Sequence, residues 1–436
     1  MATIKKFFCL VIFFYFLFSS RDLWSQIIPI KIHEGRNDLG PCEPSVAINP
    51  NNTDQIVVGS VLDYVYSSKD GGRSWQIQSL QSPYGVWGDP CVIADYDNNF
   101  YYFHLSNPSG KGWRTADLLD RIVVQKSSDG GKNWTSGASI GYHDQQHDQD
   151  KEWAAVNPKN NHLYVSWTEF DKDKSTKPQD STYILFSKST DQGESWSEAT
   201  RINQKAGNCL DNDLTVEGAV PAAGPEGQIY VAWAFNDTIY FDRSEDEGRS
   251  WLTEDKIVAA QPGGWTFDVP GLDRCNGLPI TACDLSPGRH RGTLYVNWVD
   301  MRNGEEDTDV WVAKSTDGGE RWSAPIRVND DPSGNHQFFS WMTVDPVSGY
   351  VYVVFYDRRH SHDKHTDVYL AYSKDGGETF KNIRLTEESF LLEEKTFFGD
   401  YNNIAAHNGI TYPVWTQIDD KTLSIWTARI RHDDLK

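Results

Sequence analysis

The sequence predicts an all-β fold: a β-propeller of seven blades, closed by a strand from the N-terminal end of the chain. Three observations support this prediction. A turn motif with the pattern Ser-x-Asp-x-Gly-x-x-Trp recurs six times, runs of β-forming residues recur between the copies, and helical periodicity is weak throughout. The aspartates of the six copies are Asp70, Asp129, Asp191, Asp246, Asp317 and Asp375, separated by 59, 62, 55, 71 and 58 residues.

The chemistry of this repeated turn explains its composition. The first copy runs from Ser68 to Trp75, and the sixth ends in Phe380 instead of Trp. The aspartate can accept hydrogen bonds from the backbone of its own turn, the glycine can adopt a positive φ, and the aromatic ring can anchor the turn to a sheet. One active site needs one acid, so six copies indicate a scaffold and not six catalytic groups.

The number of blades follows from the strands around these turns. Each unit of about 60 residues shows three strand-like runs before the turn and one after it, which is typical of a four-stranded propeller blade. The turns alone indicate six blades, which remains the alternative. A seventh set of strands follows the sixth turn, at 403–406, 410–415 and 423–428. Its outer strand is expected from 27–32, because pairing the two ends of the chain removes exposed sheet edges.

The N-terminal residues predict export. Lys5 and Lys6 precede an apolar run from Phe7 to Phe18, a pattern typical of a secretory signal peptide over residues 1–25. An uncleaved anchor is the alternative. The remaining chain, 26–436, is expected to be one propeller domain, secreted or periplasmic, with no transmembrane segment.

Charge and cysteine content limit the partners. The formal net charge is −21, which argues against nucleic acid and against anionic membranes. We expect a monomer that binds a glycan or glycoconjugate. Five cysteines follow the predicted signal peptide, an odd number, so at least one has no intramolecular disulfide partner. They are Cys42, Cys91, Cys209, Cys275 and Cys283.

No resident cofactor is expected, although calcium is an alternative at two acidic stretches, 143–150 and 305–309. These stretches lack EF-hand spacing, and solvated acidic loops are the preferred interpretation. His143 and His147 in the first stretch are alternative proton carriers for a polysaccharide lyase reaction.

The six turns resemble the Asp-box, or BNR, repeats of the sialidase superfamily. Four further stretches are similar to secreted bacterial proteins described as sialidase-like: Glu43–Pro50, Asp150–Val156, Phe355–Arg359 and Phe398–Tyr401. The resemblance implies a propeller that acts on glycans, with three arginines for a substrate carboxylate, a Tyr nucleophile paired with Glu, and an Asp acid/base. The Phe/Tyr-Arg-Ile-Pro motif of the first arginine is absent here, and sialidases have six blades.

Propeller geometry predicts where a site lies. The repeated turns join the third and fourth strands on one face, so the starts of the inner strands converge around the axis on the other face. A ring of polar side chains there suits a glycan or an ion, and a water-filled channel is the alternative. The converging residues are Glu43, Asp89, Lys151, Glu152, Glu217, Asn276, Gln337, Asp400 and Tyr401.

Within this ring, Glu217, Tyr401, Asp400 and Asp89 are the candidate catalytic residues. Glu217 begins an apolar strand, so burial is expected to raise its pKa. Tyr401 could act as a nucleophile if a carboxylate such as Glu217 activates it.

The candidate ligand-binding residues are Glu43, Glu152, Arg302, Arg358, Arg359 and Gln337. Arg302 and Arg359 each follow an aspartate by two residues, which predicts Asp–Arg pairs that fix the loops. An arginine held in this way can also offer its donors to an anionic sugar. Together these features predict a glycoside hydrolase, with a non-catalytic propeller that binds glycan or protein as the alternative.

Overall fold

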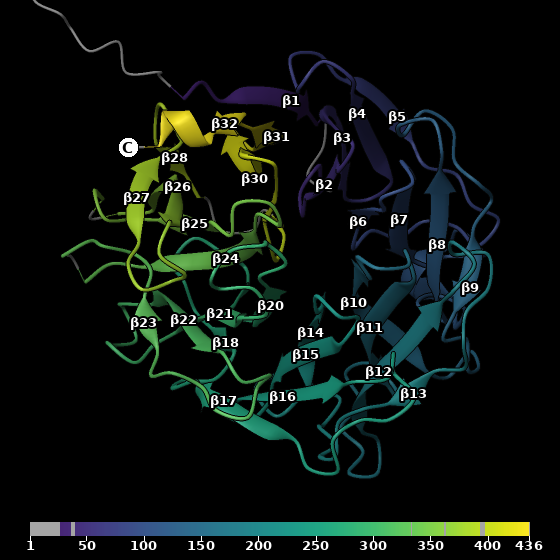
Figure 1. Ribbon diagram of the computed structural model, residues 1–436. Coiled ribbons are helices and arrows are strands. Elements are labelled where there is room, and N and C mark those ends of the chain that lie inside the picture. Colours follow the sequence, from purple (N-terminus) through teal and green to yellow (C-terminus); the bar gives the residue numbers. More distant parts are fainter. Residues whose placement is uncertain (1–26, 36–39, 333, 362, 393–396, 436) are drawn as a thin grey trace, which may run out of the picture.

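The computed structural model describes residues 27–35, 40–332, 334–361, 363–392 and 397–435, and the expected signal peptide lies outside them. Seven sheets are arranged around a central axis, as Figure 1 shows. Within the described residues, no helix has both the length and the apolar character needed to cross a membrane.

The first three blades each consist of four antiparallel strands in sequence order. Their bounds are β2 (Ser45–Asn49), β3 (Asn52–Ser60), β4 (Tyr64–Ser68) and β5 (Gln76–Ser79); β6 (Cys91–Ala94), β7 (Phe100–Leu105), β8 (Ile122–Ser127) and β9 (Ala138–Ile140); and β10 (Asp148–Val156), β11 (Leu163–Phe170), β12 (Thr182–Ser189) and β13 (Thr200–Arg201).

The next three blades repeat this order. Their bounds are β14 (Glu217–Ala223), β15 (Ile229–Ala234), β16 (Thr238–Ser244) and β17 (Lys256–Ala260); β20 (Ile280–Cys283), β21 (Leu294–Asp300), β22 (Asp309–Ser315) and β23 (Ile326–Arg327); and β24 (Gln337–Val344), β25 (Val351–Asp357), β26 (His365–Ser373) and β27 (Lys381–Arg384). A hairpin of β18 (Thr266–Phe267) and β19 (Cys275–Asn276) precedes the fifth blade, and β28 (Phe390–Leu391) pairs with β26.

The seventh blade joins the two ends of the chain. It contains β29 (Asn403–His407), β30 (Ile410–Asp419) and β31 (Thr422–Thr427), with the short β32 (Ile430–Arg431) beside β30. Its outer strand is β1 (Ile30–Glu34), which pairs antiparallel with β31. Figure 1 shows these terminal strands together at the closure. The seven-bladed ring and its closure by an N-terminal strand are therefore confirmed.

The repeated turn has the expected geometry. In the first copy, the Oγ of Ser68 donates to Asp70 at 2.9 Å, and the backbone N–H groups of Arg73 and Ser74 donate to the same carboxylate at 3.0 Å each. The indole of Trp75 donates to the carbonyl of Gly72, whose φ is +81°. The hydrogen bonds that the turn donates to the carboxylate of Asp70 hold its pKa at about 2.

The blades pack through large rings on their middle strands and leave small residues on the inner strands. Trp167, Trp233, Trp298 and Trp415 are fully buried. On the axis, a channel of about 280 Å³ is lined by residues such as Ala47, Ala94, Ala154 and Ala406. The five described cysteines are buried free thiols.

Candidate active site

The inner strands of several blades start with a residue in the left-handed region. Glu43, Asp89, Lys151, Gly218 and Phe339 have φ between +46° and +79°. β10, β14 and β24 each carry a bulge at this place. A positive φ in a non-glycine residue costs on the order of 1–3 kcal/mol and is found mainly at functional sites. The strain therefore marks the ends of the inner strands as the region to examine.

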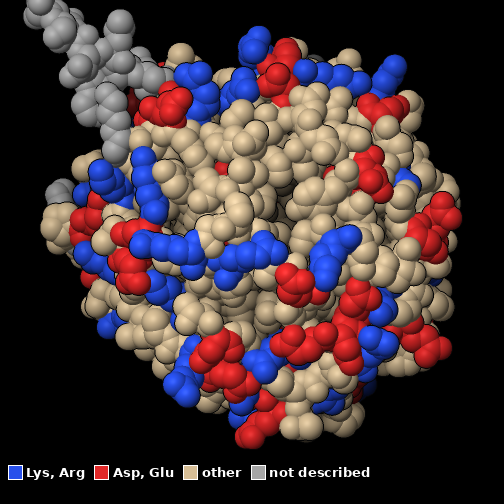
Figure 2. Space-filling model, viewed as in Figure 1, with Lys and Arg blue, Asp and Glu red and all other residues tan. Residues whose placement is uncertain are grey.

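Two adjoining cavities lie at this end of the axis. The outer cavity measures about 350 Å³ and is lined by acids that include Glu43 and Asp89 and by the rings of Trp87, Trp113 and Phe397. The inner cavity measures about 130 Å³ and is lined by acids that include Glu217 and by Trp265 of the β18–β19 hairpin. Four residues line both: Asp150, Lys151, Asp211 and Arg274. We call the two together the basin; in Figure 2, acidic and basic side chains stand side by side around the centre of the ring.

Asp400 is the centre of the polar network in the basin. Its carboxylate accepts from Nζ of Lys151 at 3.0 Å and from Nε of Arg274 at 2.7 Å, and a second nitrogen of Arg274 completes a two-pronged contact. The backbone N–H of Asp400 donates to Glu43 at 2.9 Å, and Asn276 donates to its carbonyl. This network joins the first, third and seventh blades and the β18–β19 hairpin.

The charge state of Asp400 follows from these partners. Burial alone would raise its pKa, but the ammonium of Lys151 and the guanidinium of Arg274 outweigh burial and hold the pKa of Asp400 below its usual value. Burial likewise opposes the charge of Lys151, yet Asp89 at 3.4 Å and Asp400 raise the pKa of that lysine well above its usual range. Asp400 is thus an ionised carboxylate inside the protein.

Glu217 has the opposite character. It is 1% exposed, it lines the inner cavity, and neither of its carboxylate oxygens has a hydrogen-bond partner among the described residues. Burial raises its pKa well above the usual range, and the nearby carboxylates of Asp211 and Asp150 add to the shift. Burial is also the largest cause of the raised pKa values of Glu43, Asp150 and Glu152. The surroundings of Glu217 therefore favour the protonated form of its carboxyl, in contrast to those of Asp400.

Three aromatic rings separate the basin from the axial channel. Trp153 and Trp341, whose ring centroids are 4.2 Å apart, line both the channel and a small enclosed cavity next to Lys151 and Asp400. Tyr401 lies 4.9 Å from Trp153 and lines the same small cavity. We call these three rings the aromatic floor. The hydroxyl of Tyr401 has no hydrogen-bond partner among the described residues, and burial raises its pKa well above its usual value.

The structure brings together only part of the predicted set. Glu43, Asp89, Glu217 and Asp400 line the basin, and Tyr401 lies in its floor. Glu152 is buried and both of its carboxylate oxygens lack a partner within the described residues, but it does not line the two cavities.

The predicted arginines do not reach the basin. Arg302 pairs with Asp300 and lies over the ring of Trp311 at 4.3 Å. Arg359 pairs with Asp357 at 2.8 Å and also with Asp330. These contacts confirm the expected Asp–Arg pairs, which hold the loops after β21 and β25. Both guanidinium groups bind carboxylates within these loops, and neither side chain lines the described cavities.

Arg358 and Gln337 also differ from the expectation. Arg358 is 3% exposed, donates to Thr366 at 3.1 Å and lies over the ring of Phe338. Burial lowers its pKa to about 10. Gln337 is fully buried, where its side-chain oxygen accepts from Asn329. Glu217, Tyr401 and Arg358 or Arg359 therefore do not share one of the described cavities.

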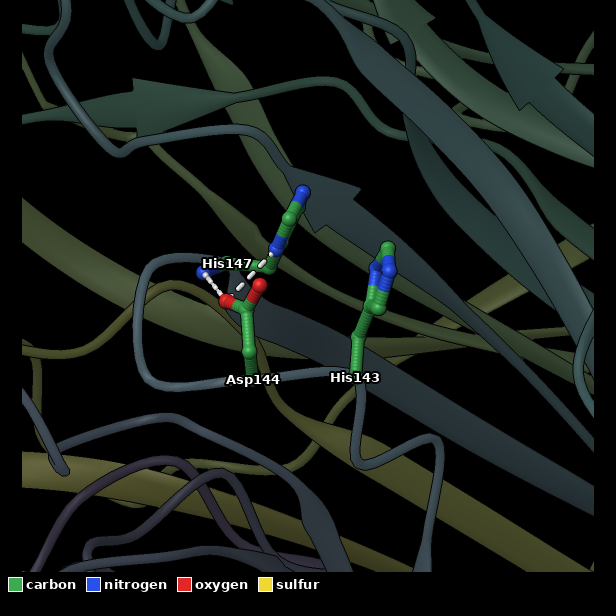
Figure 3. Close-up of side chains that lie close together, drawn as sticks. All are labelled: His143, Asp144 and His147. Carbon is green, nitrogen blue, oxygen red and sulfur yellow. Dashed lines mark hydrogen bonds and ion pairs between the residues drawn. The ribbon is translucent and has the colours of Figure 1, made fainter.

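The histidines of the first acidic stretch form a separate cluster. His143, Asp144 and His147 lie in the loop before β10, and Figure 3 shows the carboxylate of Asp144 directed at His147, which it meets at 2.8 Å. The two imidazole rings are stacked with centroids 4.1 Å apart and an angle of 19°. An imidazole binds a metal in the plane of its ring, so one ion cannot lie in both planes in this arrangement. Calcium binding at this stretch and at 305–309 remains a prediction.

Among the four residues that line both cavities, Asp211 and Arg274 were not predicted from the sequence. Asp211 lies in the segment between β13 and β14, and Arg274 lies just before β19. Neither residue lies at the start of an inner strand, which is where propeller geometry predicts that site residues converge. The available signal for Arg274 was the spacing of 71 residues between Asp246 and Asp317, the longest of the five, because this extra length folds as the β18–β19 hairpin.

Comparisons with known proteins show the fold. No protein-family model matches the sequence, and no curated protein matches it. Among solved structures, an ulvan lyase of polysaccharide lyase family PL25 aligns with a TM-score of 0.53 and 11% identity over 92% of this chain and 96% of that chain. A mutant of the NanB sialidase from Streptococcus pneumoniae gives 0.52 and 8% over 93% and 86%. A protein of unknown function from Dyadobacter fermentans gives 0.50 and 14% over 92% and 99%.

Proposed function

We propose that this protein is a secreted carbohydrate-active propeller that hydrolyses a glycosidic bond of a glycan held in the basin. One observation carries the proposal: Glu217 and Asp400 line the same cavity, and their surroundings favour opposite protonation states. Glycoside hydrolysis needs one carboxyl that protonates the leaving oxygen and one that stays ionised beside the sugar as positive charge develops.

The roles follow from the environments. Glu217 is the proton donor, because burial favours its protonated form and its oxygens are unoccupied by other described groups. Asp400 supplies the ionised carboxylate, kept charged by Lys151 and Arg274. Asp89, on the other side of Lys151, belongs to the wall of the outer cavity. Tyr401 serves as part of the floor, since the described residues place no base at its hydroxyl.

The fold and the sequence support this assignment. The solved structures that share the fold include proteins named as a sialidase and as a polysaccharide lyase. The six repeated turns support a place in the sialidase superfamily with its Asp-box repeats. The pattern at residues 1–25 supports export, which gives access to extracellular glycans.

A second candidate function is glycan binding without cleavage. It is favoured by the contacts of Asp400, whose two oxygens are already occupied by Lys151 and Arg274. A carboxylate engaged in this way is less able to attack a sugar. Binding would then use the same basin.

A glycan screen tests the proposal. The mature chain is incubated with neutral, amino-sugar, uronic-acid and sialylated oligosaccharides, and both cleavage and binding are measured. We expect cleavage of at least one, and we expect Glu217→Gln to lower kcat by about 100-fold or more. The matched control is Glu254→Gln, an exposed residue outside the basin. Binding without cleavage would favour the second candidate, and unchanged turnover in Glu217→Gln would exclude Glu217 as the acid.

A further inference from the structure

The cations of the inner cavity are concentrated on one of its acids. Four carboxyl groups line this cavity, from Asp150, Asp211, Glu217 and Asp400, against the two cations Lys151 and Arg274. Both cations contact Asp400. The other three carboxyls make no ion pair within the described part of the chain. The inner cavity therefore holds more carboxyl groups than cations, and three of its carboxyls have no counterion among the described residues.

Glu217 shows that this excess faces the cavity. It is 1% exposed and lines the cavity, and both of its oxygens lack a hydrogen-bond partner among the described residues. A buried carboxyl without partners costs free energy that a ligand's donor would recover. The oxygens of Glu217 can accept from a donor on the ligand, and the neighbouring acids favour a positively charged donor.

The acidic character continues into the outer cavity. Asp211 is partly exposed and lines both cavities, and Asp173 and Asp273 stand in the outer wall. The further cation there, Lys174, lies over the ring of Trp113 at 5.9 Å. Asp211 and Asp150 are therefore both accessible to a ligand that enters from solvent, and Asp211 also neighbours Asp173 in the outer cavity.

The spacing of these acids excludes a shared metal ion. Among the described residues, three metal-ligating groups come within 4.8 Å of one another only at His143, Asp144 and His147, outside the basin. A bound calcium ion would need several oxygens at 2.3–2.6 Å from one centre. No three of the described carboxyls of the basin come that close together, so the basin offers no three-ligand site for one ion and suits an extended organic ligand.

We propose that the basin selects a glycan that carries a free amino group, with the ammonium seated at Asp211 and flanked by Asp150 and Asp173. The proposal rests on the proposed glycan site. The rings of Trp87, Trp113 and Phe397 give the outer cavity apolar faces against which sugar rings pack. An anionic sugar is disfavoured, because Arg274, the arginine among the described lining residues, already holds Asp400 with two nitrogens.

Binding measurements test this selectivity. The mature protein is titrated by calorimetry with three probes: a glucosamine pentamer, the N-acetylated pentamer of the same backbone, and a galacturonic acid pentamer. We expect the free amine to bind at least 10-fold more tightly than the N-acetylated probe and the uronic acid to bind weakest. Equal affinities, a preference for the uronic acid, or binding of none of the probes would overturn the proposal.

Two matched variants locate the ammonium. Asp211→Asn is expected to remove at least 5-fold of the preference for the free amine, while Asp97→Asn, the same change at an exposed turn on the opposite face, leaves it unchanged. Thermal unfolding confirms that both variants fold. If Asp211→Asn keeps the preference for the free amine, the ammonium does not bind at Asp211. Amine-selective binding without cleavage would leave this inference standing and remove the hydrolase proposal; cleavage of a neutral glycan without amine preference would do the reverse.

Discussion

The two faces of the propeller use carboxylates in opposite ways. On the face of the repeated turns, Asp375 accepts from the hydroxyl of Ser373, from two backbone N–H groups and from the hydroxyl of Thr379, and its pKa is lowered to about 2. In the basin, Glu217 accepts from none of the described residues, and burial raises its pKa. Aspartates with their hydrogen bonds satisfied and a lowered pKa hold the turns, whereas Glu217 in the basin has no hydrogen-bond partner among the described residues and a raised pKa.

The difference separates scaffold from site. A carboxylate whose oxygens are fully used by its own turn stabilises the fold and has little capacity left for a ligand. A buried carboxyl without partners costs stability and is retained where a ligand or a reaction uses it. The turn occurs six times and the basin once, which supports the assignment of the turns to the scaffold and of the basin to the site.

The largest effect on stability is expected from Asp400→Asn. This change removes the common carboxylate of Lys151, whose side chain is 11% exposed, and of Arg274, whose side chain is 48% exposed, so the main loss is expected at Lys151. Removing one partner of a buried ion pair costs about 3–5 kcal/mol, which urea unfolding will measure. Asp97→Asn, at an exposed turn, is the control. A loss below about 1 kcal/mol would show that the basin network does not hold the blades together.

A smaller loss is expected from Asp375→Ala on the opposite face. The substitution removes four hydrogen bonds from one turn, but water competes for these exposed groups. We expect a loss of about 1 kcal/mol in the free energy of unfolding. Glycan affinity should not change. Weakened binding at unchanged stability would contradict the separation of the two faces.

The pH dependence of stability sharpens the comparison. Glu152 is buried, and burial raises its pKa above the ordinary value of 4.5. As pH rises above 4.5, the unfolded chain loses this proton and the folded protein keeps it, so stability falls with a slope of up to about 1.4 kcal/mol per pH unit for this group. Glu152→Gln lacks this dependence. We expect its stability relative to wild type to increase between pH 4 and 8 in urea unfolding; a constant difference would mean that Glu152 ionises normally.

The smallest effect is expected from Tyr401→Phe. The hydroxyl of Tyr401 has no partner among the described residues, and the ring keeps its contacts with Trp153 and Trp341. Turnover on a glycan found in the screen should therefore change by less than about threefold. A loss of several orders of magnitude would restore Tyr401 as a nucleophile.

Sequence reasoning predicted the parts of the molecule that local patterns encode. The seventh blade was predictable because its strand-like runs follow the same order as in the other blades, beginning with a strand of small residues, although no repeated turn follows them. β1 supplies its missing outer strand. Glu43, Asp89 and Asp400 were predictable because every inner strand starts at the same face. The basin follows from topology.

The remaining residues depend on features that single strands do not encode. Asp211 and Arg274 come from long connections, whose paths across the face depend on tertiary packing. Arg358 and Arg359 were expected at the site, but they contact Thr366 and Asp357 after β25, and neither lines the two cavities. The sequence shows that an Asp–Arg pair forms, and only the structure shows that the pair leaves no donors for the basin.

The most direct test compares Glu217→Gln and Asp375→Ala side by side on one cleaved glycan, with kcat and the free energy of unfolding measured for both. The account predicts that Glu217→Gln loses about 100-fold or more in kcat at unchanged or higher stability, because burial disfavours the charged form of this carboxyl in the folded protein. It predicts that Asp375→Ala loses stability and keeps its kcat. The opposite pattern, with turnover lost at the repeated turn and retained in the basin, would contradict the assignment of the two faces.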